Sequence, residues 1–78
     1  MRSQMEKAKL FRALHTRPGA FIIPNPWDIG SARLLAGLGF EALATTSDGA
    51  ANALGLFDGE LQRKQVIEHC RLIADATD

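Results

Sequence analysis

The pattern of apolar and polar positions predicts three helices, the first of them near the N-terminus. Ser3-Gln4-Met5-Glu6 matches the S-x-x-E capping box, in which serine and glutamate each bond the other's backbone N–H. Good helix formers follow as far as Leu14. Arg17-Pro18-Gly19 then predicts the end of this helix.

The second and third helices are predicted from a cap and from apolar spacing. Asp28 can cap a helix over Ser31–Leu38, and Gly39 stands where glycine commonly follows a helix. From Leu61 to Thr77 one face of a helix carries side chains at spacings of four, three and four residues, namely Val66, Cys70, Ile73 and Thr77.

Two short apolar runs between these helices are predicted to be buried strands. Ala20-Phe21-Ile22-Ile23 is apolar on both faces, which is typical of a parallel sheet, and Pro24-Asn25-Pro26 breaks it. Ala42-Leu43-Ala44-Thr45-Thr46 is the second run. Phe21–Ile23 and Leu43–Thr45 are therefore expected to lie side by side as parallel strands.

The order helix, strand, helix, strand, loop, helix predicts the α/β fold class. Strands that alternate with helices form parallel sheets, and the right-handed crossover rule would place the helices Ser31–Leu38 and Leu61–Ala76 on one face. Two strands alone would leave unpaired edges. Residues 1–78 are therefore expected to form the N-terminal portion of a larger α/β domain.

Composition narrows the classes of function. Nine Lys and Arg against nine Asp and Glu give a formal net charge of 0, so nothing indicates a nucleic-acid partner. No run approaches the roughly 18 apolar residues of a membrane helix, and the charged N-terminus lacks the apolar region of a secretory signal. The single cysteine, Cys70, cannot form an internal disulfide. We therefore expect a cytoplasmic protein without a membrane partner.

Ala44–Glu60, between the second strand and the last helix, is long for a loop and carries the candidate chemistry. Parallel α/β folds place their chemistry beyond the C-terminal ends of the strands, so this loop and Pro24–Asp28 are expected at one rim. Thr45-Thr46-Ser47 offers three hydroxyls and a run of backbone N–H groups that can hold a carboxylate or phosphate. The same residues can instead serve only as caps, and Asp58 can be an ordinary turn aspartate.

The remaining candidate residues leave alternatives open. Trp27 can form the aromatic wall of a binding site, or it can simply belong to the core. Asp28 is a helix cap in either case. His15 and His69 lie in helical stretches without ligand-like neighbours. The chain contains no Ser-His-Asp set, P-loop or dinucleotide fingerprint.

Taken together, Phe21–Glu60 resembles the isocitrate lyase and phosphoenolpyruvate mutase superfamily. The family pattern is an aromatic-Asp pair, S-A before an apolar helix, a G-F-E/D-A turn, a small-residue motif and L-G-x-P-D. The matching residues here are Trp27-Asp28, Ser31-Ala32, Gly39-Phe40-Glu41-Ala42, Thr45-Thr46-Ser47 and Leu54-Gly55-Leu56-Phe57-Asp58. The order and spacing of these pieces carry the resemblance.

The resemblance implies a TIM-type (β/α)8 barrel, often oligomeric, that uses Mg²⁺ to cleave or form C–C or P–C bonds in small 2-oxo or 2-hydroxy carboxylates. It implies that Thr45, Thr46 and Ser47 hold the substrate carboxylate and that Trp27 lines the pocket. It implies a catalytic role for Asp58, which would reach the metal through water or through the substrate. The acidic motif that binds Mg²⁺ directly in the family is expected beyond residue 78, so these residues are expected to supply no direct metal ligand.

Two departures from the family pattern bear on this interpretation. Phe57 replaces the family proline, which loosens the turn before Asp58, and Asp48 adds a negative charge beside the carboxylate-binding turn. The leading hypothesis is an N-terminal part of a Mg²⁺-dependent lyase or mutase, with the 78-residue chain inactive alone. The alternatives are a truncated or designed fragment that self-associates as an α/β structural module, and a small anion-binding domain that uses the Thr45–Ser47 turn.

Overall fold

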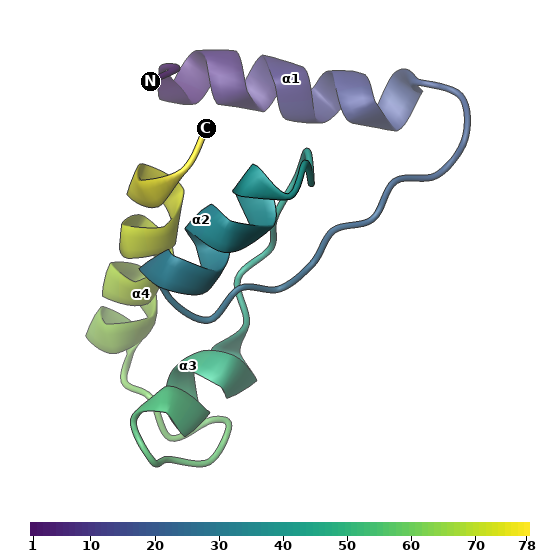
Figure 1. Cartoon of the computed structure of the whole chain (residues 1–78). Coiled ribbons are helices and arrows are strands. Elements are labelled where there is room, and N and C mark those ends of the chain that lie inside the picture. The colour runs from purple at the N-terminus through teal and green to yellow at the C-terminus, as the bar shows by residue number, and fades with distance from the viewer.

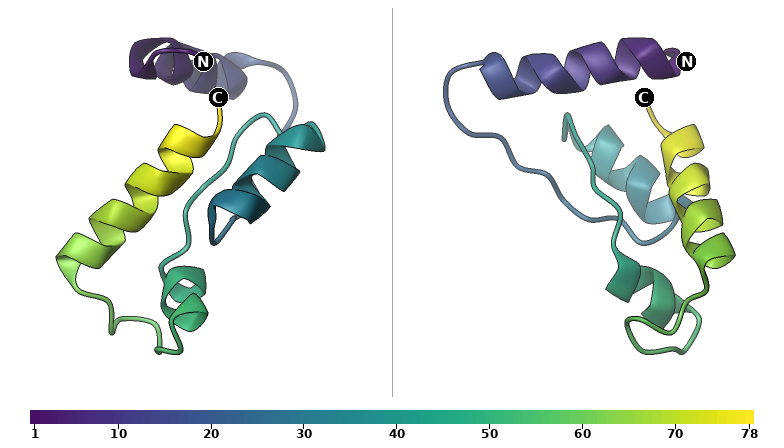
Figure 2. Two further views of the ribbon diagram at one scale, coloured as in Figure 1. Left: turned by 60° about the vertical axis from the view of Figure 1, so that its left-hand side comes forward. Right: turned by 180° about the vertical axis from the view of Figure 1, so that it is seen from behind.

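The computed structural model describes all 78 residues and contains four helices, α1 (Gln4–Thr16), α2 (Ile29–Gly37), α3 (Ser47–Ala53) and α4 (Arg63–Ala76) (Figure 1). α2 packs along α4, and α3 contacts α4 near the beginning of that helix. α1 lies across the end of the molecule where the N- and C-termini meet (Figure 2). None of the four helices combines the length and apolar composition needed to span a bilayer.

The prediction of an α/β fold was wrong, because the structure contains four helices and no strand. Ala20–Ile23 and Ala42–Thr46 are not hydrogen-bonded strands, and a single backbone bond, from Ala44 N–H to the Pro24 oxygen at 3.0 Å, connects the two regions. A ladder needs repeated N–H donors, and the prolines that follow the first run have none. An isolated pair of short strands is also marginally stable in water.

The predicted caps of the first two helices are confirmed by their hydrogen bonds. Ser3 Oγ accepts from the Glu6 N–H at 3.2 Å, and Glu6 Oε1 accepts from the Ser3 N–H at 3.1 Å. Asp28 caps α2 in the same reciprocal manner with Ser31. The last helix begins at Arg63, two residues later than predicted.

α1 is attached through side chains at the C-terminal end of α4. Lys7 Nζ donates to the backbone oxygens of Ala74 at 2.8 Å and Thr77 at 2.6 Å. These are carbonyls that the end of a helix leaves without intrahelical donors, and a cation is favoured at that end. The Arg2 N–H also donates to Asp78 Oδ1 at 2.9 Å, which holds the two termini together.

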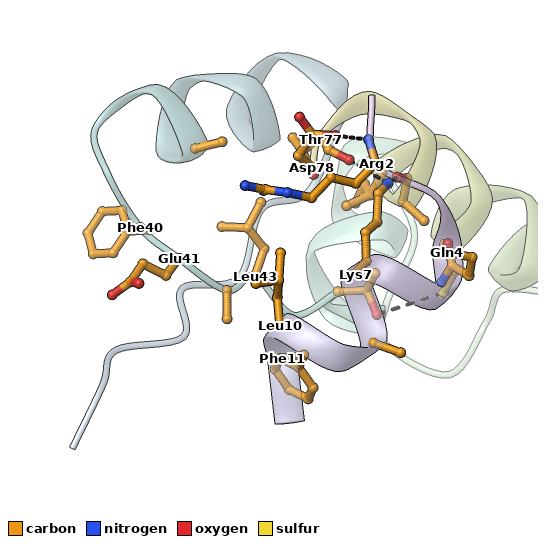
Figure 3. A pocket seen from close by; sticks show the side chains of 17 residues that line it. Arg2, Gln4, Lys7, Leu10, Phe11, Phe40, Glu41, Leu43, Thr77 and Asp78 are labelled. Carbon is orange, nitrogen blue, oxygen red and sulfur yellow. Dashed lines mark hydrogen bonds between the residues drawn. The ribbon is translucent and has the colours of Figure 1, made fainter. Parts of the chain in front are cut away.

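The buried core is small. Seven of 78 residues are buried, and the apolar ones are mostly alanines, with Leu14 and Ile73 as the large members. A groove of about 450 Å³ separates α1 from the rest of the chain (Figure 3). Leu10 and Phe11 of α1 line it opposite Leu43, and the C-terminal end of α4 forms one end. Packing between α1 and the other helices is therefore incomplete.

Candidate active site

Two loops that are distant in the sequence meet beside α3. Asn25 Nδ2 in the first loop donates to the backbone oxygens of Ala44 and Thr45 at 3.3 Å each. A Cβ atom added to Gly49 of α3 would lie 3.0 Å from the Trp27 Cβ. The structure therefore places Trp27 beside the start of α3, where the Thr45–Ser47 turn lies.

Asp58 reaches the same turn from the far end of its loop. The Ser47 hydroxyl donates to Asp58 Oδ1 at 2.9 Å, across eleven positions of the chain. Phe57, which replaces the family proline, is 78% exposed and packs nothing at this turn. A bond from the Glu60 N–H to the Phe57 oxygen at 3.1 Å closes the turn. Ser47 therefore fixes the Asp58 carboxylate where the sequence lacks a rigid proline.

Thr46 is the N-cap of α3, a short helix within the predicted loop Ala44–Glu60. Its Oγ1 accepts from the Gly49 N–H at 3.1 Å. A Cβ at Gly49 would approach the Thr46 methyl carbon to 2.6 Å, so a larger residue would push the cap aside. Accepting this bond uses a lone pair, and the hydroxyl hydrogen of Thr46 is left to donate to another group.

Thr45 lies between the first loop and α4. Its Oγ1 is 3.7 Å from Cys70 Sγ, which is within reach of a weak S–H···O bond. Thr45 is exposed, and its hydroxyl hydrogen has no acceptor within the chain. Thr45 and Thr46 therefore both have a hydroxyl hydrogen that can donate to a bound anion.

Asp28 has a structural role at the start of α2. The Ser31 N–H, 2.7 Å from Asp28 Oδ1, and the Ser31 hydroxyl hold the pKa of this carboxyl below its usual range. Ser31 Oγ also accepts from the Trp27 N–H at 3.0 Å. The cap of α2 therefore also fixes the backbone from which the Trp27 side chain projects.

His69 is a member of this site that sequence reasoning missed. Its Nε2 lies 2.8 Å from the backbone oxygen of Trp27, forty-two positions away. Because a carbonyl oxygen can only accept, Nε2 carries the hydrogen. The spacing of the α4 residues contains no signal for this contact, since it depends on how α4 packs beside the first loop.

Each aspartate of the two loops has one carboxylate oxygen bonded within the chain. Asp28 is occupied as a cap, and Asp48 Oδ1 accepts from Asn52 Nδ2 at 3.2 Å along α3. Ser47 occupies one oxygen of Asp58, and the other has no partner in the chain. The structure contains no cluster of three or more His, Cys, Asp or Glu side chains that could hold a metal ion. Asp58 keeps one carboxylate oxygen free for a ligand, as Asp28 and Asp48 also do.

The model for the phosphoenolpyruvate phosphomutase family matches residues 11–78, which include both loops. The chain belongs to this family. The predicted resemblance to the isocitrate lyase and phosphoenolpyruvate mutase superfamily is thereby confirmed.

Individual relatives agree with the family assignment. A protein from Burkholderia cenocepacia J2315, provisionally named as a lyase/mutase, has a crystal structure that matches 91% of this chain with a TM-score of 0.88 and 58% identity. Two uncharacterized proteins of Mycobacterium tuberculosis, from strains CDC 1551 / Oshkosh and H37Rv, are 41% identical over 49 residues, or 63% of this chain. The matches span only 26% of the Burkholderia protein and 19% of each mycobacterial protein.

Proposed function

We propose that this chain contributes the substrate-carboxylate site of a Mg²⁺-dependent lyase or mutase. The substrate would be a small 2-oxo or 2-hydroxy carboxylate in which a C–C or P–C bond is cleaved or formed. Family membership supports the reaction class. The observation that carries the proposal is the 2.9 Å bond between Ser47 and Asp58, because it joins the proposed carboxylate-binding turn to the proposed catalytic carboxylate.

In this proposal the hydroxyls of Thr45 and Thr46 donate to the substrate carboxylate. Ser47 acts differently, because its single hydroxyl hydrogen is already directed at Asp58. Its backbone N–H belongs to the first turn of α3, where N–H groups have no intrahelical acceptor, and this group can bind the anion instead. Trp27, 52% exposed, forms the wall beside the turn.

The donor set fits a metal contact through Asp58 alone. Mg²⁺ commonly keeps several waters and binds through one or two carboxylates together with substrate oxygens. The free oxygen of Asp58 would accept from a metal-bound water, and no direct ligand set is formed by these residues. When bound beside an oxo-carboxylate, Mg²⁺ would stabilise the negative charge that develops as a bond to the α-carbon breaks.

Titration with oxalate, a planar mimic of the enolate of a 2-oxo acid, tests the site in the 78-residue chain. Amide NMR signals of residues 45–49 should shift on titration, and oxamide, the uncharged isostere, should leave them unchanged. Mg²⁺ should enhance the shift in the native chain and not in Asp58→Asn. Shifts confined to the groove beneath α1, or equal responses to oxalate and oxamide, would contradict the proposal.

Turnover requires a longer chain, so we propose a chimera in which this chain replaces the matching part of the Burkholderia cenocepacia protein. Any small 2-oxo or 2-hydroxy acid that the parent converts with Mg²⁺ should also be converted by the chimera. Asp58→Asn should abolish that activity in the chimera. Unchanged turnover by the Asp58→Asn chimera would remove Asp58 from the mechanism. The 78-residue chain alone is expected to show no turnover.

We also propose that the chain functions as a homo-oligomer in a reducing, cytoplasmic setting. Support comes from its exposed apolar side chains, among them Ile22 at 71% and Phe57 at 78%, and from its single free cysteine, Cys70. Burial of such side chains between copies would remove apolar area from water. Sedimentation velocity over a hundred-fold concentration range tests this, and a constant monomer mass would refute it.

A further inference from the structure

We propose that His69 is a positioning residue that holds Trp27 against the carboxylate-binding turn. The inference deepens the proposed function and rests on it, because Trp27 is the proposed wall of the substrate pocket. His69 does not touch the proposed substrate position. It acts through the backbone of Trp27.

Three helices hold Trp27, each through a different atom. The Trp27 N–H donates to Ser31 Oγ of α2 at 3.0 Å, and the Trp27 oxygen accepts from His69 Nε2 of α4 at 2.8 Å. On the third side, the absence of a side chain at Gly49 of α3 lets the Trp27 Cβ approach the helix closely. Both polar backbone groups of Trp27 are therefore fixed while its indole remains half exposed.

The contribution of His69 differs from that of the other two contacts. Ser31 lies four positions from Trp27, so its bond is local and forms with the cap of α2. His69 is distant in the sequence, and its bond determines where the first loop lies relative to α4. Loss of the Nε2 donor would leave the α2 cap intact and release the Trp27 carbonyl. The indole would then sample more orientations beside the turn.

His15 provides a matched control because it has the same side chain and also contacts a backbone carbonyl. Its Nδ1 lies 2.8 Å from the Phe11 oxygen, within its own helix α1. The His15 ring also packs edge-on against Phe21, with ring centroids 5.1 Å apart, but His15 makes no hydrogen bond to Trp27. A histidine effect that depends on a hydrogen bond to the Trp27 backbone should appear at His69 and not at His15.

The experiment compares His69→Gln with His69→Met, and His15→Met serves as the control. Glutamine and methionine are both good helix formers of similar length, and only glutamine keeps an N–H donor. Trp27 is the single tryptophan of the chain, so its fluorescence reports directly on the proposed effect. His69→Met should shift the emission to longer wavelength and increase acrylamide quenching. His69→Gln and His15→Met should match the native chain.

Oxalate affinity, measured by NMR titration of the same proteins, provides the second readout. Loss of one backbone hydrogen bond should weaken oxalate binding about two- to ten-fold in His69→Met, with recovery in His69→Gln. Equal fluorescence in all four proteins, or equal loss in the glutamine and methionine variants, would overturn the proposal. If His69→Met fails to fold while His69→Gln remains native-like, the result would support the need for an N–H donor at position 69.

The two readouts separate this inference from the proposed function. If the native chain binds no oxalate, the proposed carboxylate site is refuted, and with it the role of His69 in ligand binding. The fluorescence comparison would still decide whether His69 holds Trp27. If oxalate binds with the same affinity to His69→Met and to the native chain, the site stands and the role of His69 in ligand binding is overturned.

Discussion

The hydrogen bond between Ser47 and Asp58 should give a measurable coupling free energy between these two residues. It would connect the turn before α3 to the loop that follows α3. Ser47→Ala removes the donor, and Asp58→Asn replaces the charged acceptor with a neutral amide of the same shape. The double variant completes a double-mutant cycle. The two residues contact each other directly, which is the case in which single-variant effects are expected to be non-additive.

The magnitude follows from the geometry and the exposure of the pair. A hydrogen bond to a charged acceptor contributes about 1.5–3 kcal/mol to stability, and a neutral one about 0.5–1.5 kcal/mol. The 2.9 Å separation is a normal distance for such a bond, but both residues are exposed and water competes for each. We therefore expect a coupling free energy of roughly 1 kcal/mol.

Urea unfolding of the four proteins, followed by circular dichroism, gives this coupling free energy. Amide heteronuclear NOE values over residues 54–62 should fall in both single variants because the loop loses its tie to α3. Oxalate affinity of Ser47→Ala should stay within about two-fold of the native value, since the Ser47 hydrogen is committed to Asp58. Additive stabilities together with unchanged NOE values would show that the bond does not order this loop, and the reasoning would fail.

Three further predictions concern packing, charge and pH. Gly49→Ala should destabilise the chain by about 1 kcal/mol, because the added Cβ collides with the α3 cap. Gly37→Ala, where the added Cβ meets open space, should be neutral or stabilising. Equal thermal midpoints of the two variants would contradict this. Asp48→Asn should tighten oxalate binding up to about five-fold at low salt and less at high salt, because the exposed charge repels the anion; a salt-independent gain would exclude electrostatics. The lowered pKa of Asp28 contributes stability that is present above its ordinary value of 3.8 and is lost as pH falls through the folded-state pKa. The thermal midpoint should therefore decrease as the pH is lowered below about 4. The decrease should be less steep in Asp28→Asn, whose amide still caps α2. If the midpoints of both proteins decrease in parallel with pH, the Asp28 charge contributes nothing to stability.

The sequence alone was sufficient for features that depend on neighbouring residues. Ser3 was identified as a cap from its glutamate partner three positions on, and Asp28 from its residue type before an apolar helix. The apolar face of α4 was predicted from its spacing, and Ile73 on that face is buried. The order of motifs from Trp27 to Asp58 was also sufficient to identify the family.

The sequence did not determine the state of the two apolar runs. Their composition favours strands, but a strand forms only when partners supply donors and acceptors along its length. In this structure no backbone bond joins the two runs, and the one bond near them, from the Ala44 N–H, is accepted by Pro24 just after the first run. α3 was missed because its composition does not favour a helix. Ser47–Ala53 is short, lacks an apolar period and contains Gly49.

Tertiary structure also decided how the candidate site is assembled. Ser47 meets Asp58 only because α3 turns the chain back, and His69 meets Trp27 only because α4 packs beside the first loop. The Asp58 carboxylate is held by the Ser47 hydroxyl, eleven positions away, and no local pattern specifies that contact. The sequence therefore supplied the candidate residues. Long-range packing decided which atoms each of them can reach, because those distances depend on contacts that no local spacing encodes.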